Sequence, residues 1–280
     1  MNKIYLIGNG YVSDYIVKHR INNTKFIGVC RSDKNNCDEN ISIDVSKDNT
    51  KISELIASTA SVIYLAPPQG TGTKDTTIRN FIANVEKEQI SRFIYISTSG
   101  VYGDRKDAIV NENEPVMPVT DRARRRVDAE NQVAASGIDY TILRVPGIYG
   151  KGRLPLKRIN ERLPLIKKDL CKYTNLIHAK DLAKIIIGCL TNTKTSRLII
   201  NVSDGTPIKT TDYYLKIYDA LDLSYPEFID YDQASLLYDE KRLSFIKESR
   251  ILDVSLMNKI FPDIIEYKDV HDGILDSMED

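Results

Sequence analysis

The chain has 280 residues, enough for one large α/β domain or two smaller ones with a substantial core. Lysine plus arginine equals aspartate plus glutamate, at 39 each, which argues against broad electrostatic attraction to nucleic acid or acidic membranes. No apolar run approaches the ~18 residues of a membrane span, and the amino terminus lacks a secretory apolar region. We therefore expect a cytoplasmic protein with no nucleic-acid or membrane partner.

In chain order, short apolar segments rich in β-formers alternate with helix-like segments. Residues 3–7, 25–30, 41–45, 61–66, 92–97 and 140–145 are predicted strands, and helices are predicted after the first strand and near 50–58, 74–89 and 120–136. Apolar strands separated by helices are typical of a parallel sheet covered on both faces. The predicted fold class is therefore α/β, a doubly wound parallel sheet.

After residue 150 the alternation loosens. Residues 151–175 are basic and interrupted by proline, whereas 178–190 and 210–221 are predicted helices and 197–203 a strand. We expect one domain from residues 1–150 and 176–222, and a small subdomain from 151–175 and 223–280. The four cysteines show no CxxC or metal-ligand spacing, so we expect reduced thiols and no metal site.

The stretch "LIGNGYVS" (6–13) places Gly8-x-Gly10-x-x-Ser13 between the first strand and the first helix. Glycine at the first position permits a sharp turn, and at the second it lets the backbone approach a pyrophosphate. The third position is normally Gly or Ala for close packing, and Ser13 is small but imperfect. The pattern predicts a dinucleotide-binding loop; a tight turn without a ligand is the alternative.

The end of the second strand, "VCRSD" (29–33), bears on the choice between NAD and NADP. NAD-binding proteins place an acid here for the ribose 2′-hydroxyl, whereas this chain has Arg31 followed by Ser32. A guanidinium offers several donors to a 2′-phosphate, so the sequence favours NADP over NAD. In the alternatives, Asp33 takes the hydroxyl or Arg31 only covers the surface.

Several later stretches then occur in the order expected for one family. "IDV" (43–45), "YISTSGVYGD" (95–104), "LRVPGIYGKGR" (143–153) and "NLIHAKDLAKII" (175–186) resemble motifs of the extended short-chain dehydrogenases/reductases, the NAD-dependent epimerase/dehydratase family, and most of all its atypical branch. The resemblance covers residues 1 to about 200 and implies a Rossmann-type domain followed by a small carboxyl-terminal substrate subdomain. The last 60 residues match no motif of the family.

The resemblance also implies roles for individual residues. Thr98 matches the catalytic Ser/Thr that hydrogen-bonds the substrate oxygen, whereas His178 and Asp181 match a motif that is usually structural. The residues implied at the cofactor are Gly8, Gly10, Tyr11, Val12, Ser13, Arg31, Ser32, Asp44, Val45, Ala66, Pro67, Pro68, Pro146, Gly147 and Ile148.

One departure from the family lies in "VTDRARRRVDAE" (119–130), where a Tyr-x-x-x-Lys catalytic pair is expected. Counting back from Glu130 puts Arg122 and Arg126 at those two places, four residues apart and so on one helix face. Arg126 can replace the lysine as a cation. Arg122 cannot replace the tyrosine, because a guanidinium stays protonated and is a poor proton shuttle.

Three ways around the missing tyrosine remain open. Another side chain supplies the proton, with Tyr102, Tyr149, Tyr173 and His178 as candidates. Alternatively, Thr98 and water suffice, or Arg122 and Arg126 clamp a carboxylate or phosphate of the substrate. The neighbouring Arg124 and Arg125 are expected on a solvated helix face.

Two functions follow from this pattern. The first is an NADP-dependent oxidoreductase or epimerase/dehydratase-like enzyme with a non-standard active site, acting on a small polar substrate such as a nucleotide sugar. The second is a non-catalytic NADP(H)-binding sensor or scaffold, which the absent tyrosine supports. Relatives often form homodimers through the helices near 74–89 and 120–136, so a homodimer is an expectation from the resemblance.

Overall fold

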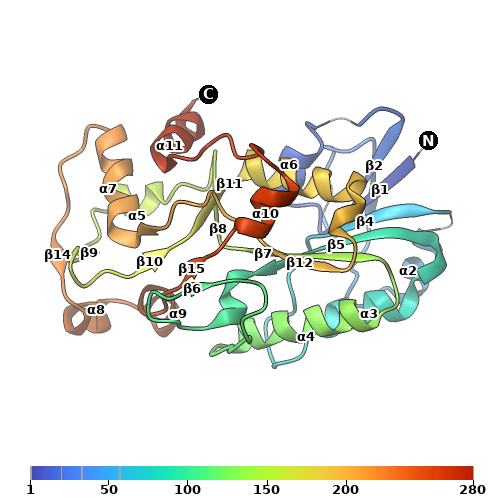
Figure 1. The fold of residues 1–280 in the computed structure, drawn as a ribbon, viewed down its shortest axis with the longest axis horizontal. Helices are drawn as coiled ribbons and strands as arrows, with labels where there is room; N and C mark the ends of the chain where they lie inside the picture. The colour runs from blue at the N-terminus through green and yellow to red at the C-terminus, as the bar shows by residue number, and fades with distance from the viewer. Residues whose placement is uncertain (1, 20, 33, 57, 280) are drawn as a thin grey trace.

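A parallel sheet of seven strands forms the centre of the protein (Figure 1), in a computed structural model that describes residues 2–19, 21–32, 34–56 and 58–279. The strand order is β12-β7-β5-β4-β1-β2-β3, and it reverses direction between β1 and β4. This confirms the predicted doubly wound α/β fold. The strands are β1 (Asn2–Ile7), β2 (Thr24–Cys30), β3 (Glu39–Ser42), β4 (Ala60–Tyr64), β5 (Ile90–Thr98), β7 (Tyr140–Val145) and β12 (Leu198–Asn201).

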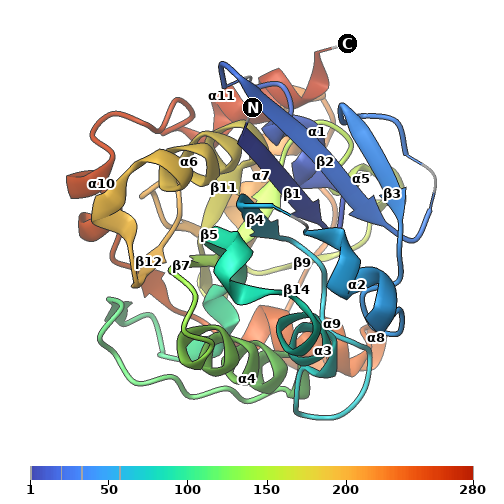
Figure 2. The same cartoon turned by 90° about the vertical axis from the view of Figure 1, so that its right-hand side faces the viewer.

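Helices cover both faces of the sheet (Figure 2). On one face lie α1 (Tyr11–Ile16) and α6 (Ala179–Thr191), and on the other α2 (Asn49–Leu55), α3 (Thr76–Asn84) and α4 (Asp121–Ala135). Short 3₁₀ turns follow α3, β5 and α6: η1 (Lys87–Gln89), η2 (Ser99–Tyr102) and η3 (Thr193–Thr195). Within the described residues, no helix is long and apolar enough to cross a membrane.

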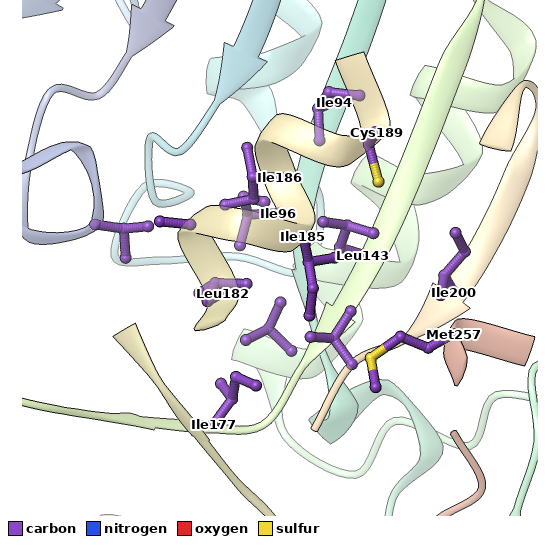
Figure 3. Close-up of a cluster of buried hydrophobic side chains, with 14 of the residues drawn as sticks. Ile94, Ile96, Leu143, Ile177, Leu182, Ile185, Ile186, Cys189, Ile200 and Met257 are labelled. Atoms are coloured by element: carbon purple, nitrogen blue, oxygen red, sulfur yellow. The ribbon is translucent and has the colours of Figure 1, made fainter. Parts of the chain in front are cut away.

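The helix α6 shows why this face is stable. Its buried positions recur at helical spacing, so that Leu182, Ile185 and Ile186 point together at the sheet. They pack over Ile94 of β5 and Leu143 of β7, as Figure 3 shows. The whole stripe is withdrawn from water, and each such side chain contributes roughly 1.5–3 kcal/mol of burial free energy.

A second hydrophobic core lies beyond the carboxyl-end edge of the sheet. It joins α5 (Leu156–Asn160), α7 (Thr210–Ala220) and α11 (Val270–Met278), while α8 (Tyr231–Leu237) and α9 (Glu240–Lys247) lie at the end of the molecule far from the amino terminus (Figure 1). Two-residue strands pair here: β9 (Leu165–Ile166) with β14 (Phe228–Ile229), and β10 (Tyr173–Thr174) with β13 (Ile208–Lys209). Helix α7, assigned from sequence to the large domain, contributes its buried side to this second core, and the exact boundary stays a prediction.

The carboxyl-terminal segment returns to the large sheet. Strand β15 (Ile251–Leu252) pairs in parallel with β6 (Ile109–Val110), and α10 (Ser255–Ile260) places Met257 near Ile200 of β12 (Figure 3). A further parallel pair is formed by β8 (Gly147–Tyr149) and β11 (Leu176–His178). His178 is fully buried against Ser277, and Asp181 accepts the backbone N–H groups of Glu266 and Tyr267. These two residues therefore hold the carboxyl-terminal region, the structural role that the sequence motif implied.

A buried ion pair fixes α4 on the sheet. The Glu130 carboxylate accepts three bonds from Arg144 of β7, the shortest at 2.7 Å, and one from Ser97 Oγ of β5 at 2.5 Å. The Arg144 guanidinium lies 4.8 Å from the ring centre of Tyr102, whose hydroxyl donates to Asn201 at 2.8 Å. A buried charge without a partner is strongly destabilising, so the Glu130–Arg144 pair must stay together. It therefore fixes the position of α4 relative to β7.

Replacing Glu130 with alanine should leave Arg144 buried without its counter-charge. We expect the free energy of unfolding to fall by about 3–5 kcal/mol, measured by urea denaturation. Asp121→Ala is the matched control, because it breaks the exposed Asp121–Arg124 pair and should cost at most ~1 kcal/mol. Equal losses in the two variants would contradict the structural role of the buried pair.

Candidate functional site

A cavity of about 540 Å³ opens at the carboxyl ends of β1, β2, β3 and β4. This is the edge at which ligands bind in open parallel sheets, beside the point where the strand order reverses. Its size is that of a pocket for a small molecule or cofactor. The predicted residues in its wall are Gly8, Gly10, Arg31, Ser32, Asp44, Val45, Ala66, Pro67 and Pro68.

The two glycines of the loop do different work. Gly8 has φ +86°, and a Cβ there would lie 2.5 Å from the backbone N of Ala66, so glycine is needed where the chain after β1 approaches the chain after β4. A Cβ on Gly10 would meet only the Gly8 carbonyl oxygen, at 3.6 Å. The backbone at Gly10 therefore leaves room on the cavity side, which fits the close approach of a pyrophosphate.

The next three residues lie behind this wall. Val12 and Ser13 are buried, and the Ser13 hydroxyl has no hydrogen-bond partner, so Ser13 serves as the small residue that lets α1 pack on the sheet. The Tyr11 side chain contacts Tyr15 and Arg153. Its hydroxyl forms a hydrogen bond with that of Tyr15 at 3.1 Å, and the Arg153 guanidinium lies 4.3 Å from its ring centre. A cofactor role for Tyr11, Val12 and Ser13 stays a prediction.

Charged groups cluster where β2 and β3 end. Arg31 and Ser32 are exposed there, and Asp44 accepts the backbone N–H and hydroxyl of Ser46. These bonds, with help from Lys47 and Arg31, lower the pKa of Asp44, so the carboxylate stays ionised. Asp33, the alternative partner for a ribose, lies outside the described residues.

A loop that the sequence did not point to covers the glycine turn. Asn9, between the two glycines, bonds through its side chain to Asn36 and Asn40. Lys34 donates to the carbonyl of Gly10 at 2.9 Å and pairs with Asp14 at 2.8 Å. No spacing rule predicts these contacts, because they depend on β2 pairing with β3.

A second cavity, of about 200 Å³, lies at the ends of β5 and β7. Because β4 pairs with β5, it lies next to the first cavity along the same sheet edge. It is smaller than the ~300 Å³ at the low end for ligand pockets, so it suits the reacting part of a small polar molecule. Its wall contains Thr98, Ser99, Gly100, Arg122, Pro146, Gly147, Tyr173, Thr174, Asn175, Glu248 and Arg250.

Four residues predicted at the site therefore meet in this wall: Thr98, Arg122, Pro146 and Gly147. The Thr98 oxygen accepts the Gly100 N–H at 3.2 Å, so its own hydrogen can be donated to a substrate oxygen. Partial burial lowers the pKa of Arg122, opposed by the nearby Glu248. Ile148, predicted at the cofactor, instead packs against the large hydrophobic core.

Arg126 has a different place from the one expected. Its Nη1 donates to the Tyr95 hydroxyl at 2.9 Å and to the Ile96 carbonyl at 3.1 Å, behind the cavity wall that Arg122 lines. The two arginines share a helix face, but the buried hydroxyl draws the second guanidinium inward. Burial nevertheless raises the pKa of Tyr95 to about 12, so this pair is no substitute for a tyrosine that ionises readily.

The expectation for the adjacent arginines holds at one of the two. Arg124 is exposed and pairs with Asp121 at 2.6 Å. The prediction for Arg125 is wrong: it is 7% exposed and donates to the carbonyl of Gly72. Charge alone suggested a solvated face, but the long arginine reaches across to the loop that precedes α3.

Of the four proposed proton donors, Tyr173 lies in the cavity wall. Tyr102 donates its hydroxyl to Asn201 in the buried network. Tyr149 is 1% exposed, and burial raises its pKa, while burial lowers the pKa of His178. These three side chains support the core.

Glu248 and Arg250 are the site residues that the sequence did not reveal. Arg250 donates to the carbonyls of Gly103 and Ser99, at 2.8 and 3.1 Å, and to Glu248 Oε2 at 2.6 Å. They belong to the 60 residues without a motif, and the β15–β6 pairing helps to bring them to the cavity. Within the described residues, no cluster of three or more His, Cys, Asp or Glu side chains could hold a metal ion.

The sheet order and the glycine turn define a Rossmann-type fold, and the two cavities lie at its ligand-binding edge. The model of the NAD(P)H-binding family matches residues 29–193. The chain belongs to this NAD(P)H-binding family, and a nicotinamide dinucleotide is its class of cofactor.

Solved structures share the fold over nearly the whole chain. A UDP-glucuronic acid 4-epimerase from Bacillus cereus, in complex with NAD, is 18% identical with a TM-score of 0.77, covering 98% of this chain and 96% of that one. A UDP-glucose 4-epimerase from Thermotoga maritima, with UDP-glucose, is 15% identical with a TM-score of 0.80, covering 99% and 97%. A conserved protein of unknown function from Silicibacter pomeroyi is 20% identical, with a TM-score of 0.76 and coverage of 99% and 98%.

One curated relative is similar in sequence. The chloroplast stem-loop binding protein of 41 kDa b from Arabidopsis thaliana is 26% identical over 162 residues, which are 55% of this chain. The match spans 42% of that protein, so this chain corresponds to less than half of its relative's length.

Gly10→Val should fill the space beside the glycine turn and leave the core untouched. We expect dinucleotide affinity, measured by calorimetry, to fall at least about tenfold, or ~1.4 kcal/mol, at an unchanged melting temperature. Gly137→Val is the control, because no atom lies within 4 Å of a Cβ there and the residue does not line the cavity. Valine at its φ of +84° should lower the stability of the protein but not its affinity for the dinucleotide. Undiminished affinity in Gly10→Val would show that the turn does not approach the ligand.

Proposed function

We propose that the protein is an NAD(P)-dependent oxidoreductase or epimerase/dehydratase-like enzyme with a non-standard active site. The observation that carries this proposal is the second cavity, in which Thr98, Arg122, Pro146 and Gly147 share one wall beside the dinucleotide cavity. In this proposal Thr98 would hydrogen-bond the substrate oxygen, and Pro146 and Gly147 would hold the nicotinamide end of the cofactor. When bound, the cofactor accepts or supplies a hydride at this wall.

NADP is the proposed cofactor, with NAD bound less well. Arg31 and Ser32 stand exposed in the wall where β2 ends, and both carry donors suited to a 2′-phosphate. Asp44 would face the adenine side. Its ionised carboxylate is already bonded to Ser46, which leaves Arg31 as the group for the phosphate.

Arg31→Ala should weaken NADP binding by about tenfold to a hundredfold and leave NAD binding nearly unchanged, because only NADP carries the phosphate. Calorimetric titration of NADP, NADPH, NAD and NADH into nucleotide-stripped protein measures both. Lys51→Ala, an exposed cation on α2 outside the cavity wall, is the control. If Arg31→Ala and the unaltered protein bind NADP with the same affinity, the assignment of Arg31 to the 2′-phosphate is refuted.

The proposed substrate is a small polar molecule, with a nucleotide sugar as the first candidate. The second cavity is small, and polar side chains such as Thr98, Asn175 and Arg250 line part of its wall. The B. cereus and T. maritima proteins of the same fold are epimerases for UDP-glucuronic acid and UDP-glucose. Residues 151–175 and 223–280 would form the substrate-binding or lid subdomain.

The substrate proposal is tested with UDP-glucuronic acid and UDP-glucose, each with NADP⁺ or NAD⁺. We expect either reduced nicotinamide, seen by absorbance, or an epimerised sugar, seen by chromatography. Thr98→Val should lower kcat about a hundredfold, since it removes one hydrogen bond to the reacting oxygen. Thr50→Val, on the exposed face of α2, should have no effect.

A non-catalytic sensor is the second candidate, and the guanidinium of Arg122 at the place of the catalytic phenol favours it. A sensor requires different affinities for the oxidised and reduced cofactor. The calorimetric titration already described reports this ratio. A large ratio without turnover of any probe would favour the sensor over the enzyme.

A further inference from the structure

We propose that Glu248 is the catalytic acid/base that replaces the missing tyrosine. This inference rests on the proposed enzymatic function and deepens it. The carboxylate lies in the wall of the same small cavity as Thr98 and Arg122, on the segment between α9 and β15. Its side chain is 19% exposed, so it is enclosed by protein and still reaches the cavity.

The backbone around Glu248 is held on both sides. The N–H of Ser249 donates to Asp104 at 2.9 Å, and the carbonyl of Ser249 accepts from Arg105 at 2.7 Å. Ser249 Oγ donates to Asp107 and also lies 3.3 Å from the carbonyl oxygen of Tyr173. Because these partners belong to the loop after β5 and to β10, the segment is fixed against the strand that carries Thr98.

The next residue extends this support. Arg250 spans from Glu248 to the carbonyls of Ser99 and Gly103, and its own carbonyl accepts from Asn175 at 2.9 Å. A catalytic group needs such support, because a base that is misplaced by about 1 Å loses much of its effect. The Glu248 carboxylate therefore has a defined position in the wall of the cavity that Thr98 also lines.

Two arginines share the cavity wall with the Glu248 carboxylate. Arg250 binds Oε2 directly, and Arg122 stands in the same wall. A carboxylate has about four lone-pair sites, so the bond from Arg250 leaves capacity to accept a proton. The arrangement is that of a general base, which suits oxidation of an alcohol.

The step balances with the oxidised nicotinamide as the hydride acceptor. The substrate hydroxyl, hydrogen-bonded to Thr98, loses its proton to Glu248 as the C–H hydrogen leaves with its electron pair to the nicotinamide. The C–O bond becomes a carbonyl, and Glu248 becomes a neutral acid. In the reverse direction the same acid returns the proton to the oxygen that receives the hydride at its carbon.

Tyr173, the phenol in the same wall, is the competing candidate. A phenol must lose its proton to act as a base, and its ordinary pKa is about 10. Lys209 lies over the Tyr173 ring, 6.0 Å from its centroid. A carboxylate oxygen accepts a proton directly, so Glu248 is the better candidate for the base.

The kinetic test uses the sugar nucleotide that the unaltered protein oxidises or epimerises. Glu248→Gln keeps an oxygen for the Arg250 bond but cannot accept a proton, so kcat should fall about a hundredfold or more, with a small change in KM. Glu112→Gln is the matched control, since Glu112 is a half-buried carboxylate that bonds the Asn201 N–H outside the cavity wall. Tyr173→Phe is measured beside them.

The second readout needs neither substrate nor cofactor. Glu248→Ala leaves a space beside Arg250, and sodium formate titrated by calorimetry should bind to this variant and not to the unaltered protein.

A third readout is chemical rescue during turnover, with substrate and cofactor present. Formate should restore the kcat of Glu248→Ala in proportion to the formate concentration. A merely structural glutamate gives no such rescue, because formate cannot restore a tether between chain segments.

The outcomes separate the inference from the function on which it rests. A low kcat of Glu248→Gln, together with rescue of Glu248→Ala by formate, supports the inference. Full kcat in Glu248→Gln, or a larger kcat loss in Tyr173→Phe, overturns it and leaves the enzymatic function standing. No turnover by the unaltered protein, with dinucleotide bound, overturns both.

Discussion

All strands of the central sheet run in one direction, so every strand delivers the loop after it to the same edge. Both faces of the sheet are covered by helices and apolar side chains, which leaves the strand ends open for polar groups. The two cavities lie side by side on that edge because β4 and β5 are hydrogen-bonded neighbours. The position of the site is thus a consequence of strand direction before any particular side chain is considered.

Helix α4 connects this edge to the rest of the fold. Its inner side is held by the Glu130–Arg144 ion pair, and one turn nearer its start Arg126 bonds the Tyr95 hydroxyl. Only the first turn, with Arg122, reaches a cavity wall. Where a Tyr-x-x-x-Lys pair would present a phenol and an ammonium together, this helix presents one guanidinium and buries the other.

The carboxyl-terminal segment changes the electrostatics of that wall. A guanidinium in place of a phenol adds a positive charge, and Glu248 supplies a negative one from the opposite end of the chain. Arg250 connects the carboxyl-terminal segment to the η2 region by donating to the carbonyls of Ser99 and Gly103. An acid/base group on a late segment can reach the site only when that segment is fastened to the loop after β5, and the β15–β6 pairing does this.

Much of the fold followed from the residue pattern. The apolar strands, the glycine turn at residues 8–10 and the ordered motifs were sufficient for the doubly wound sheet, because local periodicity reports which faces are buried. Motif matching also brought Thr98, Arg122, Pro146 and Gly147 to one wall. The direction of Arg125 and Arg126 could not be read from spacing, because a long side chain bends toward whichever partner the neighbouring strand or loop offers. The arrival of Glu248 and Arg250 depended on contacts between residues more than a hundred positions apart, and no pattern within a window of sequence contains such contacts.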